Sequence, residues 1–150
     1  MTYSSPPVEI RQGVARRRHD LYTAMQDLEA SAARASGQPD WEMKVREALT
    51  NLMTSLEQHV AEIEAPTGLF TEVIDVAPHL SSAVDSLRTE HQEMLEACGS
   101  ALEAISGDGS GQANEIRRQV LLLLGILAVH RQTGAELLYD TYNVDLATGD

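Results

Sequence analysis

The chain of 150 residues has few aromatic side chains, few prolines and a single cysteine. Aromatic residues make up 4% of it, and no segment alternates between apolar and polar positions. Because β-strands favour aromatic and β-branched residues in such alternation, a β-sheet fold is excluded. The one cysteine, Cys98, excludes an internal disulfide. It falls in an apolar helical pattern and is predicted to be a core residue rather than a nucleophile.

Positive charge is also scarce, since 11 basic residues face 23 acidic ones and the net charge is −12. An acidic surface repels phosphate backbones, which excludes nucleic acid as a partner. The basic run at 16–18 is interpreted as a solvated helix face. The N-terminus lacks the apolar stretch of a signal peptide, and the longest apolar run, 120–129, is about half of a membrane span. We therefore expect a cytoplasmic protein without membrane contact.

What the sequence does have is four long helical segments, separated by glycine and proline. They are predicted at about 7–36, 40–66, 78–106 and 113–143, with a loop at 107–112. The link 66–77 has room for a short helix. Apolar residues recur every three or four positions, as in helices that face a common core. This predicts an all-α fold, an antiparallel up-down-up-down four-helix bundle, formed by one domain over 1–150 with flexible ends at 1–6 and 144–150.

Histidines interrupt these apolar stripes. His59, His91 and His130 each take a core position in their segment, and His19 lies at the edge of the first stripe. All four lie 15 to 19 residues from the same end of the predicted bundle. At about 1.5 Å per residue, this places them roughly 22–29 Å from that end, in one layer. Buried imidazoles need partners for both ring nitrogens, which either a metal ion or a polar hydrogen-bond network would supply.

Carboxylates accompany these histidines. Glu62 follows His59 by three residues and Glu64 follows it by five, whereas Glu136 follows His130 by six. Glu90 is adjacent to His91. Mixed histidine and carboxylate ligands inside a helical bundle are typical of di-iron or di-manganese centres. The predicted metal ligands are His19, His59, Glu62, His91, His130 and Glu136, with Glu64 as an alternative carboxylate.

The sequence resembles the hemerythrin-like domain over roughly 10–145. The resemblance rests on four segments, one per helix: RRRHDLY, HVAEIE, LRTEHQEML and HRQTGAELLY. It implies a four-helix bundle with a non-haem di-iron centre that binds or senses O₂, NO or peroxide. The chain departs from the family pattern at Ile63, where the family has a carboxylate, and at Leu87 and Leu95, where some relatives have a second histidine.

These sequence features leave two alternative functions. The first is a non-haem di-iron protein whose small ligand is O₂, NO or peroxide, with weak oxidase- or peroxidase-like activity as an open possibility. The second is a bundle that has lost its metal and acts as a regulatory or protein-interaction module, which the departures at Ile63 and Leu87 favour. No sequence motif for nucleophilic, nucleotide-dependent or dithiol chemistry is present.

Overall fold

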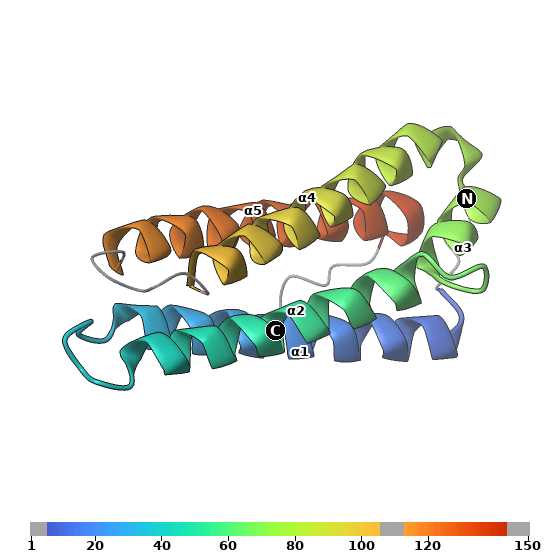
Figure 1. The fold of residues 1–150 in the computed structure, drawn as a ribbon. Helices are drawn as coiled ribbons and strands as arrows, with labels where there is room; N and C mark the ends of the chain where they lie inside the picture. Colours follow the sequence, from blue (N-terminus) through green and yellow to red (C-terminus); the bar gives the residue numbers. More distant parts are fainter. Residues whose placement is uncertain (1–5, 106–112, 144–150) are drawn as a thin grey trace.

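The computed structural model describes residues 6–105 and 113–143, and within these ranges all regular structure is helical. The expected loop at 107–112, the expected end at 144–150 and all but the last residue of the expected end at 1–6 lie outside the described residues. The elements are α1 (Val8–Ala33), α2 (Trp41–Ile63), α3 (Leu69–Val76), the 3₁₀ helix η1 (Pro78–Leu80), α4 (Ser81–Ile105) and α5 (Ala113–Tyr142). The all-α prediction is confirmed, as is the short helix in the link 66–77 (Figure 1).

The four long helices lie side by side. Helix α1 contacts α2 and α5, and α4 contacts α2 and α5, while α3 and η1 pack against one end of α4. The turn before α3 brings the chain back against the end of α2. A side chain at Gly68 would collide with the backbone carbonyl oxygens of Glu62 and Ile63, so this close approach requires glycine.

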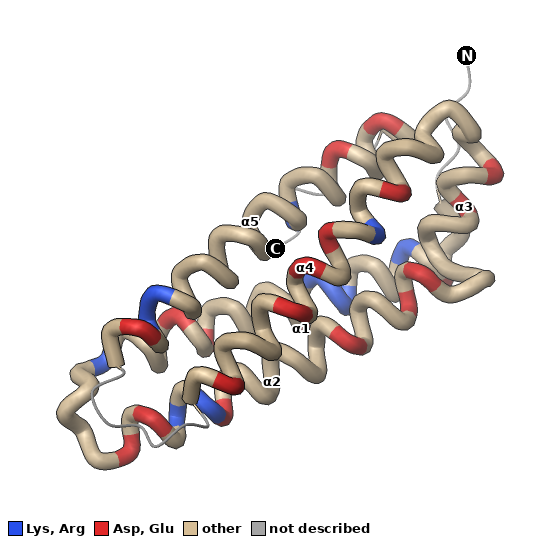
Figure 2. The backbone as a smooth tube through the Cα atoms, turned by 45° about the horizontal axis from the view of Figure 1, so that its top comes forward, with Lys and Arg blue, Asp and Glu red and all other residues tan. Residues whose placement is uncertain are grey.

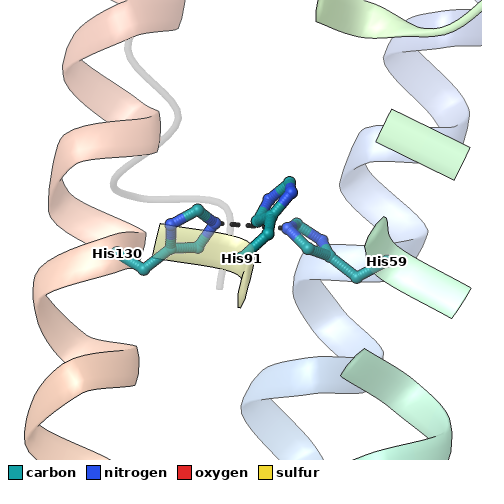
Figure 3. A group of neighbouring side chains, drawn as sticks. All are labelled: His59, His91 and His130. Carbon is teal, nitrogen blue, oxygen red and sulfur yellow. Dashed lines mark hydrogen bonds between the residues drawn. The ribbon is translucent and has the colours of Figure 1, made fainter. Parts of the chain in front are cut away.

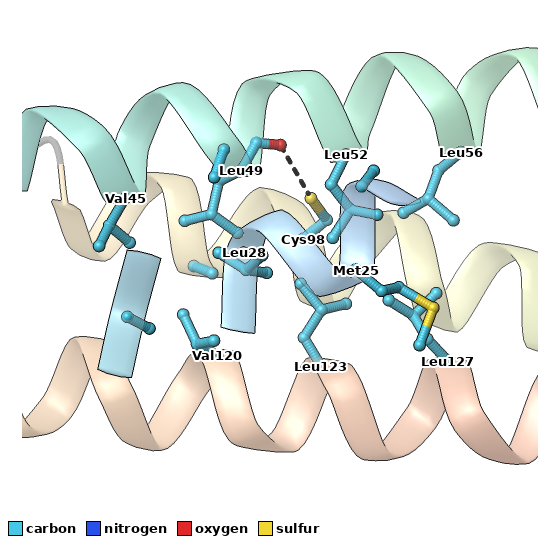
Figure 4. Packing of buried hydrophobic residues seen from close by; sticks show 14 of the residues in the cluster. Met25, Leu28, Val45, Leu49, Leu52, Leu56, Cys98, Val120, Leu123 and Leu127 are labelled. Atoms are coloured by element: carbon cyan, nitrogen blue, oxygen red, sulfur yellow. Dashed lines mark hydrogen bonds between the residues drawn. The ribbon is translucent and has the colours of Figure 1, made fainter. Parts of the chain in front are cut away.

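The core has two parts. One apolar cluster fills the half of the molecule near the α1–α2 connection and includes Leu28, Leu49, Cys98 and Leu123 (Figure 4). A second cluster, which includes Val73, fills the half near α3. Cys98 is fully buried, as predicted, with its Sγ 3.7 Å from the carbonyl oxygen of Leu49. Between the two clusters lies a layer that contains the histidines.

Helix α5 has apolar side chains on its outer face as well as its inner face. Leu121, Leu122 and Val129 are more than half exposed. By length and composition alone this helix is apolar enough to cross a membrane. One such helix is weak evidence, because core helices of soluble proteins pass the same criterion. The cytoplasmic location and the absence of membrane contact stay predictions.

Candidate metal centre

Three histidines from three helices meet in the middle of the molecule. His59 comes from α2, His91 from α4 and His130 from α5 (Figure 3). All three side chains are buried, and their ring centroids lie 4.8–5.5 Å apart. Each offers a ring nitrogen within 4.8 Å of the other two. Each histidine takes the place of an apolar residue in the stripe of its own helix, which is why all three point inward.

Carboxylates form hydrogen bonds with the Nδ1 atoms of two of the rings. Nδ1 of His91 donates to Glu64 at 2.6 Å, and Nδ1 of His130 donates to Glu90 at 2.8 Å. The hydroxyl of Thr133 donates to the same oxygen of Glu90 at 2.9 Å. Because an ionised carboxylate only accepts hydrogen bonds, the Nδ1 atoms carry the ring protons. In a neutral imidazole the lone pair is then on Nε2, the nitrogen that a metal would bind.

The remaining nitrogens of the three rings cannot all be paired with one another. Nε2 of His59 lies 3.3 Å from Nε2 of His130, while Nε2 of His91 and Nδ1 of His59 are buried without a partner among the described residues. If His59 carries its proton on Nε2, it donates to His130, and its own Nδ1 and Nε2 of His91 stay unpaired. If it carries the proton on Nδ1, two lone pairs face each other at 3.3 Å. Either tautomer leaves buried polar atoms that cost free energy.

A metal ion bound by the three Nε2 atoms would remove most of this cost and leave only Nδ1 of His59 without a partner among the described residues. Two nitrogens at about 2.0–2.1 Å from a tetrahedral ion are themselves about 3.3–3.4 Å apart. The 3.3 Å between Nε2 of His59 and Nε2 of His130 matches that separation. Three neutral imidazoles, two of them oriented by carboxylates, are also the donor arrangement of metal sites that keep one coordination position open. The residues present therefore fit a metal ion.

The surroundings keep these imidazoles neutral. Burial lowers the pKa of His59 well below its ordinary value, and His91 and His130 lower it further. Burial, followed by the charges of His130 and Arg88, lowers the pKa of His91 to about 3. Burial also lowers the pKa of His130, although its bond to Glu90 opposes the change. Neutral rings at physiological pH can bind a cation without first losing a proton.

A cavity of about 40 Å³ lies beside the three rings. Its walls are mostly apolar and include Phe70, whose ring stacks on that of His91 with centroids 5.4 Å apart. Gly134, one turn after His130, also lines it. A single water needs about 10–15 Å³ by this kind of measure, so the cavity has room for a ligand of a few atoms. Such a ligand would lie next to the nitrogens that face inward.

The structure brings three of the four expected histidines into this layer and places the fourth, His19, outside it. His19 is exposed and is not part of the histidine group. The position on α1 that faces the layer is that of the preceding residue, Arg18, which lines the cavity. Arg18 lies four residues after Val14 and three before Leu21, in phase with the apolar stripe, whereas His19 is about 100° further round the helix.

Two predicted carboxylate ligands also lie elsewhere. Glu62 faces α1, where it accepts a hydrogen bond from Nε of Arg17 at 2.6 Å in a space that Gly13 leaves open. Glu136 is exposed and accepts from Gln132 at 3.0 Å. Helix α5 is a continuous α-helix through this region, so Glu136, six residues after His130, lies on a different face of it. Neither carboxylate belongs to the group formed by the histidines.

The sequence pattern missed the roles of two other residues. Glu90 is next to His91 in the sequence, yet in the structure it binds His130 on the next helix. Glu64 was a candidate ligand, but in the structure it holds Nδ1 of His91. Arg18 is a correction to the sequence analysis, because the run at 16–18 was interpreted as a solvated face and Arg18 lines the cavity. Its spacing from Val14 and Leu21 is the sequence signal that identifies it.

Comparison with protein-family models, with curated proteins and with solved structures found no match. The hemerythrin-like resemblance thus stays a prediction from the sequence.

Proposed function

We propose that His59, His91 and His130 bind one divalent transition-metal ion, whose open coordination position faces the small cavity and takes a small ligand. The observation that carries this proposal is the convergence of three buried imidazoles: Nε2 of His59 and Nε2 of His130 lie 3.3 Å apart, and Nε2 of His91 has no partner among the described residues. The carboxylates of Glu64 and Glu90 support it, because they orient two rings with Nε2 inward.

Iron is the metal that we favour. Imidazole ligands suit iron, zinc, copper and nickel alike, so the choice rests on the resemblance to the hemerythrin-like domain. The same resemblance suggests O₂, NO or peroxide as the small ligand, and an antiparallel up-down-up-down arrangement of the four long helices. A second iron would need further donors, and the described residues bring His19, Glu62 and Glu136 to other places. We therefore infer one ion rather than two.

The deciding experiment is metal analysis of protein expressed in iron-rich medium and purified without chelator. One equivalent of iron per chain is the expected result. Two equivalents, with the near-ultraviolet absorption of an oxo-bridged ferric pair, would support the di-iron form that the sequence suggested. No stoichiometric metal, also after anaerobic reconstitution with Fe²⁺ or Zn²⁺, would rule out the proposal.

The alternative of a metal-free interaction module is favoured by one observation, the lack of a carboxylate within the ligand group. The two functions differ in what a chelator does. Bound metal stabilises the folded state by mass action, so the holo protein should lose thermal stability in EDTA. A protein with a purely structural histidine layer would unfold at the same temperature with and without EDTA.

A further inference from the structure

Arg88 contacts two of the groups that hold His91 in place. It lies on α4 one turn before His91, and it is the one arginine or lysine of a helix whose other charged side chains are acidic (Figure 2). Its Nη1 pairs at 3.5 Å with Oε1 of Glu64, whose Oε2 accepts the hydrogen bond from Nδ1 of His91. Its guanidinium also lies 5.2 Å from the centroid of the Phe70 ring, which stacks on the imidazole of His91. One side chain therefore links the carboxylate and the aromatic ring that both touch His91.

These two contacts restrict different motions of the His91 ring. The hydrogen bond to Nδ1 prevents a half-turn of the ring, which would exchange Nε2 with a carbon. It leaves the ring able to tilt about its Cβ–Cγ bond, a torsion with broad minima in histidine. The ring of Phe70 is inclined by only 14° to the imidazole, with the centroids 5.4 Å apart, so it occupies the space into which the imidazole would tilt. Glu64 thus selects the nitrogen that faces inward, and Phe70 sets the plane of the ring.

A comparable arrangement surrounds His130. Thr133, one turn after His130 on α5, donates to the same oxygen of Glu90 that accepts from Nδ1 of His130. In both places the carboxylate comes from another part of the chain. A residue three positions from the histidine, on the histidine's own helix, then holds that carboxylate. This repetition indicates that the orientation of the two rings is a requirement of the site and not an accident of packing at one of them.

The charge of Arg88 acts on a metal ion in the opposite direction. Burial and then His130 lower the pKa of His91, and the charge of Arg88 lowers it further. This charge therefore reaches the imidazole and would repel a cation bound there. Water weakens the repulsion, because the Arg88 side chain is 39% exposed, whereas the contacts of the fully buried His91 ring are screened much less. We therefore expect the positioning effect of Arg88 to exceed its repulsion.

We propose that Arg88 and Phe70 are positioning residues of the metal site. Arg88 holds the carboxylate that orients His91, and Phe70 fixes the plane of the same ring, so that its Nε2 faces the ion. The short helix α3 thereby takes part in the site, because Phe70, the one phenylalanine of the chain, is buried there. Neither residue would touch the ion, since both act through His91. This inference rests on the proposed function and assigns two further residues to it.

The test compares the Zn²⁺ affinity of Arg88→Met with that of the wild type, measured by competition with a chromogenic chelator. Methionine removes both the charge and the planar fork of arginine and keeps an unbranched apolar chain. We expect binding to weaken by about tenfold, the lower end of the range for residues that orient metal-bound histidines. If repulsion exceeded positioning, the same variant would bind Zn²⁺ more tightly than the wild type. Arg88→Lys keeps the charge without the fork, and its affinity should lie between the two.

Phe70→Leu removes the stacked ring and keeps an apolar side chain. A stacked ring pair contributes about 2–10-fold to an equilibrium, so Zn²⁺ binding should weaken by about that factor. Nuclear magnetic resonance of the zinc-loaded protein provides a second readout. The Nδ1 proton of His91 should exchange slowly with water in the wild type and faster in Arg88→Met and Phe70→Leu.

The matched control is Arg17→Met. Burial is the main cause of the low pKa of His59, and the charge of Arg17 adds to it, but the hydrogen bond of Arg17 is to Glu62, outside the layer. This variant removes a nearby charge and no positioning contact, so it should bind Zn²⁺ at least as tightly as the wild type. A further check places Arg88→Met in the Glu64→Gln background. Because Arg88 acts through Glu64, most of its effect should disappear there.

The metal site and the positioning role fail in different ways. If the wild type binds no Zn²⁺, the metal site itself is refuted and this inference falls with it. If the wild type binds Zn²⁺ and Arg88→Met binds it as tightly or more tightly, only the positioning role is overturned. Full addition of the Arg88→Met and Glu64→Gln effects would overturn it equally. Circular dichroism verifies that each variant folds; if Phe70→Leu does not fold, the Arg88 variants decide.

Discussion

Glu90 on α4 accepts a hydrogen bond from Nδ1 of His130 on α5 at 2.8 Å, and this bond fixes which nitrogen of His130 faces His59. Glu64 does the same for His91 at 2.6 Å. Each carboxylate orients a ring that belongs to a different helix. The histidine layer is thus held by bonds between helices and not only by the packing of each ring.

Glu64→Gln and Glu90→Gln should each weaken metal binding by about 10–100-fold, because carboxylates that hold metal-bound histidines contribute about that much to affinity. Competition of Zn²⁺ between the protein and a chromogenic chelator measures the change. Glu62→Gln is the control, since Glu62 is on α2 two residues before Glu64 but pairs with Arg17. Equal affinity losses in all three variants would show that metal binding depends on the total negative charge nearby and not on the bonds of Glu64 and Glu90 to the histidines.

Replacing His59, His91 or His130 by alanine should reduce metal affinity by about 100-fold or more, beyond the effect of the carboxylate variants, because a ligand itself is lost. His19→Ala and His79→Ala should bind metal as the wild type does, since both residues are exposed. Isothermal titration with Zn²⁺ distinguishes the two sets. A loss in His19→Ala comparable to that in His91→Ala would restore the four-histidine site expected from the sequence.

Without metal, the free energy of unfolding should fall as the pH drops below about 6.5. The pKa of each layer histidine is lowered in the folded chain, to about 3 for His91. The unfolded chain therefore binds protons first, and the contribution of these residues is complete above pH 6.5 and lost progressively between 6.5 and about 3. Urea titrations across this range in EDTA measure it.

The comparison for this pH effect is His91→Leu, which removes one of the titrating groups and leaves the surface carboxylates in place. Its stability should depend less steeply on pH than that of the wild type. Two parallel curves would mean that His91 is not held in its neutral form by the fold.

Cys98 should resist alkylation in the folded protein. It is fully buried, and burial raises the pKa of its thiol to about 12, so almost no thiolate is present at neutral pH. Mass spectrometry after treatment with iodoacetamide should find little labelling in buffer and complete labelling in denaturant. Rapid labelling under native conditions would contradict this placement in the core.

The helices could be predicted because their stripes repeat at regular spacing. Leu49, Leu52 and Leu56 lead directly to His59 on one face of α2, and the structure buries all four. The three buried histidines could be predicted for the same reason. In α1 the position of the apolar stripe that faces the layer is taken by a charged residue, Arg18. The prediction chose the next residue, His19, instead. Such a shift changes the direction of a side chain by about 100°.

The carboxylates could not be assigned from spacing along one helix. Glu62 is closer in sequence to His59 than Glu64 is, yet it faces Arg17. Glu64 follows the end of α2 and reaches α4, and Glu90 reaches α5. Contacts between helices depend on how the helices are rotated against one another, which periodicity within a single helix does not determine.

The three imidazoles would clamp α2, α4 and α5 together around an ion, while α1 contributes only a guanidinium to the same level. Metal loading would therefore fasten three of the long helices and leave the fourth attached through its apolar contacts and polar bonds such as that of Arg17 to Glu62. The ion would then act mechanically, because it would tighten α2, α4 and α5 against one another and leave the attachment of α1 unchanged.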